Sequence, residues 1–140
     1  MDDTPTGGTY TLILDLPHAV DIEVGALGTH HLSAGAYAYT GSALGRGGFA
    51  RVDRHRRVAA GDHDVRHWHI DFLTGHPATD LVTVVTAGVD AECAVAERLP
   101  PGPIPGFGAS DCDCRSHLAA ADAVTPLVDA VEAVYRLVEN

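Results

Sequence analysis

Tyrosine, arginine and histidine side chains concentrate in residues 35–57, which read GAYAYTGSALGRGGFARVDRHRR. Arg51, Arg54 and His55 stand at positions i, i+3 and i+4, a spacing that places two guanidiniums and an imidazole on one face of a helix. Tyr39 and a glycine-rich loop precede them. Guanidinium groups recognise phosphate oxygens through paired hydrogen bonds, so these residue types in this order predict a phosphate-binding site.

The elements that must position these side chains are a strand, a loop and a helix. Tyr37, Tyr39 and Gly41 alternate with other residues and therefore share one face of a predicted strand. The glycine-rich sequence GRGG ends that strand. Phe49 and Val52 then have the spacing of the inward face of a helix. We expect this strand, loop and helix to hold a phosphate group.

Two more strands are predicted before this one and another after it. Residues 9–16 alternate, Pro17 and His18 turn the chain, and residues 22–24 return as a short antiparallel partner. Connections this short favour antiparallel neighbours. Residues 81–87 are apolar and β-branched on both faces, which predicts a buried strand that either extends the sheet or packs it against helices.

Three further helices are predicted. One spans residues 67–73, and another spans residues 91–99 behind an Asp90 N-cap. In the last, Thr125 caps the helix and Pro126 takes its first position, ahead of an apolar stripe at helical spacing. This last element is expected to be a packing helix.

The size of the chain, 140 residues with 46% apolar composition, matches one compact domain over residues 1–140. We expect an α/β (α+β) fold in which a small central three-stranded antiparallel sheet is flanked by helices, with an added C-terminal helix. No stretch approaches the roughly 20 apolar residues of a membrane span, and residues 1–6 lack a signal-peptide core. We therefore expect a cytoplasmic protein with no membrane partner.

The charge of the chain is strongly acidic but unevenly distributed. The net charge is -10, there is no lysine, and aspartate outnumbers glutamate, a composition typical of proteins adapted to high salt. Six of the nine arginines lie within residues 46–66, which carry +3 while the rest of the chain carries -13. This arginine island coincides with the predicted phosphate site. A solvated helix face is the plain alternative.

Four short features resemble the GIY-YIG nuclease superfamily. Residues 8–10, Gly-Thr-Tyr, match the Gly-x-Tyr of the family's first strand, and residues 39–41, Tyr-Thr-Gly, match the Tyr-x-Gly of its second. Arg51 corresponds to the catalytic arginine of the following helix, and His55 to a histidine that often assists it. The ordered set makes the resemblance specific, whereas Gly-x-Tyr alone carries no weight.

Longer motifs narrow the resemblance to one mainly archaeal branch, which also occurs fused to DNA-repair glycosylases. They are GSA at 41–43 with its glycine loop, HWHID at 67–71, and FGASDC at 107–112 leading to His117 and Leu118. The resemblance extends from about Gly8 to Leu118 and implies a GIY-YIG-like fold.

The resemblance also implies a function, a divalent-metal-dependent endonuclease that hydrolyses phosphodiester bonds in DNA, in repair or recombination. Tyr39, with Tyr10, would activate or orient the attacking water, and Arg51 would clamp the phosphate. His55 would relay a proton or donate to the phosphate. Glu92 would hold a single Mg²⁺ or Mn²⁺ that supports the leaving oxygen. An unperturbed tyrosine has a pKa of about 10, so nearby cations must lower it.

Further residues are candidates for contact with nucleic acid or metal. The expected substrate-binding set is Gly41, Ser42, Arg46, Arg54, His67 and His69. Glu97 is the reserve candidate for the metal, and Glu92 has an alternative as an ordinary carboxylate in the first turn of its helix. The late asparagine common in the superfamily has no counterpart, so Asp71 or Asp111 is expected to replace it.

Structural interpretations stay open for three of these side chains. Tyr10 shares a strand face with three leucines and can be a core residue whose hydroxyl reaches a polar site. His67 and Asp71 stand at i and i+4 on a predicted helix, either as a metal or substrate site or as a common structural pair.

The cysteines leave a second chemistry open. Zinc could bind a set of Cys93, Cys112, Cys114 and His117, although Cys-x-Cys lacks the usual two-residue gap; otherwise we expect reduced thiols. The rival function classes are a catalytically silent nucleic-acid-binding module and a zinc-stabilised interaction domain. The expected partners are nucleic acid, DNA in particular, and a repair protein.

Overall fold

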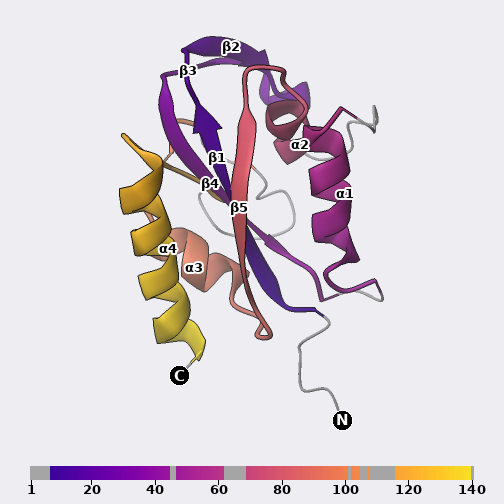
Figure 1. The fold of residues 1–140 in the computed structure, drawn as a ribbon, viewed down its shortest axis with the longest axis vertical. Helices are drawn as coiled ribbons and strands as arrows, with labels where there is room; N and C mark the ends of the chain where they lie inside the picture. The colour runs from indigo at the N-terminus through magenta and orange to yellow at the C-terminus, as the bar shows by residue number, and fades with distance from the viewer. Residues whose placement is uncertain are drawn as a thin grey trace.

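The structure, a computed structural model, describes residues 7–44, 47–61, 69–100, 102–104, 107 and 116–139. They form a mixed α+β fold with a four-stranded antiparallel sheet, a two-stranded sheet and four α-helices (Figure 1). The strands are β1 (Thr9–Leu16), β2 (Val20–Glu23), β3 (Thr29–Leu32), β4 (Gly35–Ser42), β5 (Asp80–Ala87) and β6 (Leu118–Ala121). The helices are α1 (Ala50–Ala59), α2 (His69–Thr74), α3 (Glu92–Arg98) and α4 (Val124–Glu139), with a 3-10 turn, η1, at Gly25–Leu27.

The expected α+β class is confirmed, but the main sheet has four strands in the order β5-β1-β4-β6. β1 lies inside this sheet because both of its faces are apolar. Leu12 and Leu14 point into one hydrophobic core and Ile13 into the other, and all three are fully buried. Buried backbone groups need hydrogen-bond partners, so β1 requires a neighbouring strand on each edge.

The short strand expected to pair with β1 pairs elsewhere. β2 hydrogen-bonds to β3 and forms the separate two-stranded sheet. Within β2, Ile22 is buried, whereas Asp21 and Glu23 are exposed. The edge of β1 that the prediction gave to this strand is occupied by β5 instead.

The strand predicted at 81–87 extends the sheet, but it is not buried on both faces. β5 is the outermost strand, and it is exposed along much of its length. Val82, for example, is 49% exposed. Leu81 and Val84 of this strand pack against the core on the face that carries the tyrosines.

Helices cover both faces of the main sheet (Figure 1). α1 and α2 contribute Val52, Ile70 and Leu73 to the core on the face that also carries the tyrosines. α3 and α4 cover the opposite face, and the predicted stripe of α4 is confirmed by its buried residues Leu127, Val131, Val134 and Tyr135. Among the helices that the structure describes, none has the length and apolar character needed to cross a membrane.

Two predicted helix starts are wrong. α3 begins at Glu92 with Ala91 as its N-cap, and no side chain caps it. In place of Asp90, the hydroxyl of Thr9 donates to the carbonyl of Val89 and accepts from the backbone N–H of Ala91 at 2.9 Å. Thr9 is the first residue of β1, so the start of the central strand holds the start of α3.

The C-terminal helix begins two residues earlier than predicted. α4 starts at Val124, so Thr125 and Pro126 lie inside its first turn, where proline's missing N–H is harmless. α2 begins at His69, and the predicted His67 and Trp68 lie outside the described residues.

Candidate active site

A hydrogen bond between Tyr10 and His55 forms the centre of the site. The Tyr10 hydroxyl lies 2.7 Å from Nε2 of His55, which joins β1 to α1. Both side chains are buried, at 1% and 0% exposure. The alternation of β1 turns Tyr10 toward α1, and the helical spacing of α1 turns His55 inward beside Val52 and Val58.

Gly41 makes room for the Tyr10 ring. The two residues are direct cross-strand partners in β1 and β4. A Cβ atom at position 41 would lie 2.5 Å from the Tyr10 hydroxyl oxygen and 2.6 Å from the ring carbon Cζ. Gly41 was predicted as a substrate contact, but this close approach gives the glycine of Tyr-x-Gly a structural reason.

Tyr39 completes an aromatic group on the same face of the sheet. Its ring centroid lies 6.3 Å from that of Tyr10 and 6.2 Å from that of His55. Phe107 packs edge-on against Tyr39 at 6.0 Å. These distances fall in the range of favourable ring contacts, so the three aromatic rings around His55 form one packed unit.

Arg51 lies at the exposed border of this group, near the start of α1. Its Nη1 donates to the carbonyl oxygen of Ser42 across 2.6 Å. Its positive charge also lies close enough to Tyr10 to lower the pKa of that hydroxyl. Ser42, predicted to contact substrate, therefore holds Arg51 through its backbone carbonyl, and the arginine is both exposed and anchored.

The ionisation of Tyr10 and His55 follows from their burial. Burial raises the pKa of Tyr10 well above its usual value, the nearby Tyr39 and Glu92 raise this pKa further, and Arg51 opposes them. Burial lowers the pKa of His55 to about 4, with Arg54 and Arg51 also lowering it and Asp71 opposing. Both groups are therefore neutral at pH 7 and share one hydrogen bond.

Arg54 is engaged by a buried carboxylate. Its Nη1 and Nη2 donate to the two carboxylate oxygens of Asp71 at 2.9 and 2.8 Å. Asp71 is 0% exposed, and this hydrogen bonding raises the pKa of Arg54. This ion pair joins α1 to α2. It occupies the groups that Arg54 would need for the predicted substrate contact and that Asp71 would need to replace the family's asparagine.

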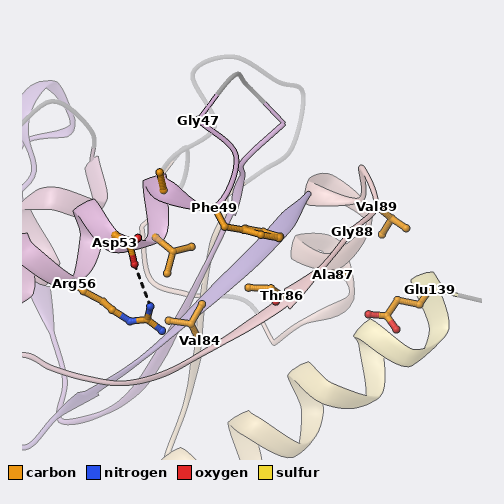
Figure 2. A pocket seen from close by; sticks show the side chains of 12 residues that line it. Gly47, Phe49, Asp53, Arg56, Val84, Thr86, Ala87, Gly88, Val89 and Glu139 are labelled. Atoms are coloured by element: carbon orange, nitrogen blue, oxygen red, sulfur yellow. Dashed lines mark ion pairs between the residues drawn. The ribbon is translucent and has the colours of Figure 1, made fainter. Parts of the chain in front are cut away.

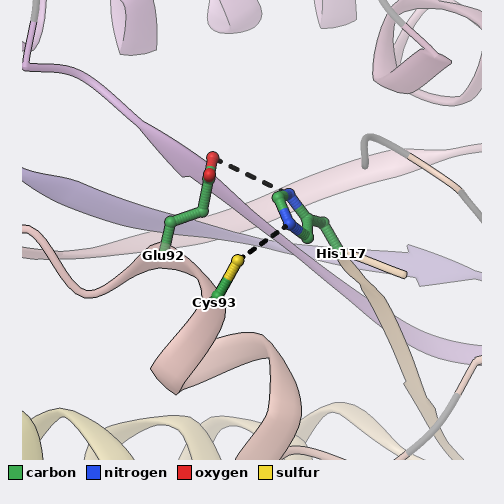
Figure 3. Close-up of side chains that lie close together, drawn as sticks. All are labelled: Glu92, Cys93 and His117. Carbon is green, nitrogen blue, oxygen red and sulfur yellow. Dashed lines mark hydrogen bonds and ion pairs between the residues drawn. The ribbon is translucent and has the colours of Figure 1, made fainter. Parts of the chain in front are cut away.

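Glu92 lies close enough to the central pair for its charge to raise the pKa of Tyr10. On its other side, Oε2 of Glu92 lies 3.7 Å from Nδ1 of His117 (Figure 3). Nε2 of His117 lies 4.0 Å from the sulfur of Cys93. Burial lowers the pKa of His117, so its ring is neutral at pH 7.

Cys93 is disulfide-bonded, which corrects the prediction of reduced thiols. That prediction assumed the usual redox state of an intracellular protein, whereas bond formation depends on which sulfurs the fold brings together. The other members of the predicted zinc set, Cys112 and Cys114, lie outside the described residues.

The remaining candidates are dispersed or not described. His69 packs against Phe107, with 5.7 Å between ring centroids. Glu97, the reserve metal ligand, is exposed on α3. Arg46, His67 and Asp111 lie outside the described residues.

A broad pocket lies elsewhere, between α1 and β5 (Figure 2). Phe49, Asp53 and Arg56 line it on the helix side, and Val84 and Thr86 line it on the strand side. It contains none of the tyrosines, Arg51, His55 or Glu92. The pocket therefore lies apart from the side chains that the sequence predicted to do chemistry.

The family described as Domain of unknown function DUF123 matches residues 9–140. The chain belongs to this family. No curated protein and no solved structure matches the chain. The family match extends from the first residue of β1 through α4, so it covers every element that carries the candidate site.

Sequence reasoning missed two contributors to the site. Thr9 anchors the start of α3, and Phe107 packs against both Tyr39 and His69. The position of Thr9 directly before Tyr10 was the available signal that Thr9 contributes to the site. Phe107 comes from a Pro/Gly-rich loop, where periodicity carries no information.

Proposed function

We propose that the protein is a divalent-metal-dependent endonuclease of the GIY-YIG type that hydrolyses phosphodiester bonds in DNA, in repair or recombination. One observation carries the proposal. An exposed arginine, Arg51, is anchored beside the neutral Tyr10–His55 pair, while Tyr39 and the charge of Glu92 act on the same tyrosine. These residue types also match the motifs of that superfamily in order along the chain.

Arg51 is the phosphate-binding group of the proposal. Its hydrogen bond to the Ser42 carbonyl preorganises the guanidinium, and its exposure leaves it accessible to a nucleic-acid backbone. In hydrolysis, a water oxygen attacks phosphorus and the bond to the leaving sugar oxygen breaks. A fixed cation stabilises the negative charge that develops on the phosphoryl oxygens during this exchange.

Tyr10 is better suited to positioning Arg51 than to accepting a proton. With its raised pKa, its hydroxyl keeps the proton, shares a hydrogen bond with His55 and lies beside the charge of Arg51. His55, neutral with its pKa of about 4, holds this hydroxyl in place. The role of orienting the attacking water therefore falls to Tyr39.

The residues present fit a weakly held Mg²⁺ or Mn²⁺. Glu92 is a carboxylate with 25% side-chain exposure, and hard cations with retained water ligands need only one or two such groups. When bound, the ion supplies a positive charge for the leaving oxygen. Removing the metal with a chelator should stop cleavage and leave the fold intact, because one carboxylate does not build a structural metal centre.

The experiment that tests the proposal compares three proteins on a panel of single-stranded, duplex, flap and branched DNAs. It uses molar KCl with Mg²⁺ or Mn²⁺, and the proteins are wild type, Arg51→Ala and Arg57→Ala. Arg57 is a matched control because it is exposed on the same helix. We expect wild type and Arg57→Ala to cleave, and Arg51→Ala to lose at least about 100-fold in rate while remaining folded.

The same panel distinguishes the alternatives. Wild-type protein that binds these DNAs without cutting them would identify a catalytically silent nucleic-acid-binding module. A folded Arg51→Ala protein with full activity would remove the central claim. Protein that neither binds nor cuts any member of the panel would contradict both functions.

A further inference from the structure

A compact group of side chains that can bind a metal lies where the start of α3 meets the start of β6. Glu92, Cys93 and His117 each offer one ligand atom, and these atoms lie within 4.8 Å of one another. Two of the residues are neighbours at the start of α3, and His117 comes from the backbone just before β6. In Figure 3 the carboxylate and the sulfur approach the two nitrogens of the one imidazole ring.

His117 is buried, and its backbone is held in place independently of these contacts. The residue is 2% exposed. The backbone N–H of His117 donates to the carbonyl of Phe107 at 2.7 Å, and its carbonyl accepts from the N–H of Thr40 at 3.0 Å. A metal at this position would therefore meet a buried imidazole on a fixed backbone, with two side chains of α3 within reach of it.

The distances are close to those of a tetrahedral zinc centre. Zinc–sulfur and zinc–nitrogen bonds of about 2.3 and 2.0 Å place sulfur and nitrogen about 3.5 Å apart. The observed separation between Cys93 Sγ and His117 Nε2 is 4.0 Å, within reach of a small side-chain rotation. A thiolate with an imidazole selects zinc over the hard cations Mg²⁺ and Ca²⁺.

The oxidation state of Cys93 decides whether this site exists. In the structure Cys93 is disulfide-bonded, and only a thiolate sulfur is a zinc ligand. We propose that reduction of this disulfide by a dithiol creates a zinc site made of Glu92, Cys93 and His117.

Reduction of the Cys93 disulfide by a dithiol is a two-electron thiol–disulfide exchange. The two sulfurs of the dithiol join and supply two electrons and two protons, and the disulfide bond of Cys93 breaks into two thiols. The Cys93 thiol releases its proton when zinc binds.

Occupation of this site would also affect Glu92. A carboxylate bound to zinc is not available to Mg²⁺, so zinc would act as an inhibitor that only the reduced protein can bind. This consequence rests on the proposed nuclease function, whereas zinc binding itself does not.

Zinc binding is measured on the full chain with and without prior reduction. A trialkylphosphine serves as the reductant because, unlike a dithiol, it does not chelate zinc. It reduces the disulfide to two thiols and becomes a phosphine oxide with oxygen from water. After its removal, the protein is equilibrated with Zn²⁺ in excess Mg²⁺, and bound zinc is measured by atomic absorption. We expect about one zinc ion per reduced chain, bound at least about tenfold more tightly than to the oxidised chain.

Three variants, all compared in the reduced state, assign the ligands. Cys93→Ser and His117→Asn should each weaken zinc binding at least about tenfold. Glu97→Gln, an exposed glutamate of the same helix, should bind as wild type. Replacing zinc by Co²⁺ gives a second readout, since a thiolate–cobalt absorption band should appear in wild type and be lost in Cys93→Ser.

Any of three results would overturn the proposal. The first is equal zinc affinity of the oxidised and reduced wild-type proteins. The second is a reduced Cys93→Ser protein, folded by circular dichroism, that binds zinc as tightly as wild type. The third is unfolding of the reduced protein that zinc fails to reverse. None of these results depends on cleavage, so they leave the nuclease proposal to its own test.

Discussion

The Tyr10 hydroxyl and Nε2 of His55 share a hydrogen bond of 2.7 Å, and this contact joins the central strand to the arginine-bearing helix. The positive charge of Arg51 lies near the same hydroxyl. Because both members of the pair are buried and neutral at pH 7, the pair carries no charge of its own, and the Arg51 guanidinium is held by the carbonyl of Ser42.

The buried His55 predicts that stability falls as the pH is lowered. Its pKa is about 4 in the folded protein against 6.5 for an ordinary histidine, so the unfolded chain binds the proton first. Stability is fully present above pH 6.5 and is lost as the pH falls toward 4, by up to about 3 kcal/mol. Urea unfolding of wild type and His55→Gln between pH 7 and 4 measures this loss.

The His55→Gln protein should be less stable at pH 7 but should lose less stability over the same range. His18→Gln serves as the control, because His18 is exposed. Parallel losses in wild type and His55→Gln would show that the pKa of His55 is not depressed.

Substitution of Gly41 should destabilise the protein through the Tyr10 ring. In Gly41→Ala the new Cβ would lie 2.5 Å from the hydroxyl oxygen, so the ring or strand must move. We expect a loss of about 1–3 kcal/mol in the free energy of unfolding, as for other overpacked sites. Gly47→Ala is the comparison, since its Cβ meets only the Ala50 side chain at 3.8 Å.

A double variant identifies the cause. Tyr10→Leu removes the aromatic ring, so adding Gly41→Ala to Tyr10→Leu should cost much less than adding it to wild type. An equal cost in both backgrounds would locate the strain elsewhere in β4.

The Arg54–Asp71 pair should be essential to stability. Arg54→Ala leaves a fully buried carboxylate without its bidentate partner, and we expect a loss of about 3–5 kcal/mol. Replacing both residues by apolar ones, Arg54→Met with Asp71→Leu, should recover most of it. Arg56→Ala removes an exposed ion pair with Asp53 and should change stability by less than about 0.5 kcal/mol. Thermal or chemical unfolding distinguishes these outcomes.

Activity should rise with salt before it falls. At low salt the chain's -10 charge should repel DNA and destabilise the fold, although the arginine island is basic. Screening at about 1 M salt reaches roughly 3 Å, which relieves repulsion and leaves bidentate arginine contacts to hold the substrate. We expect an optimum near or above about 1 M KCl.

Cleavage or binding is measured across KCl at fixed Mg²⁺, with circular dichroism following the fold. A monotonic decline from low salt, with the protein folded throughout, would instead describe an ordinary electrostatic DNA binder.

Local patterns in the sequence predicted the faces of the elements well. The alternation in residues 9–16 and 35–42 placed Tyr10, Tyr37 and Tyr39 on one side of the sheet, and the spacing of α1 turned His55 inward. Repeat periods of 2 and 3.6 residues are set by backbone geometry, so they can be read without knowing what lies opposite. Which of these groups bind phosphate or metal stays a prediction.

Only the tertiary structure decided which faces meet. Three outcomes depended on contacts between distant segments of the chain. Arg54 pairs with Asp71 instead of facing a phosphate, Thr9 instead of Asp90 anchors α3, and β5 instead of β2 pairs with β1. The disulfide of Cys93 likewise depends on which sulfur the fold brings next to it. Such contacts are chosen by the burial of whole surfaces and the pairing of buried polar groups, and neither quantity is contained in a local stretch of residues.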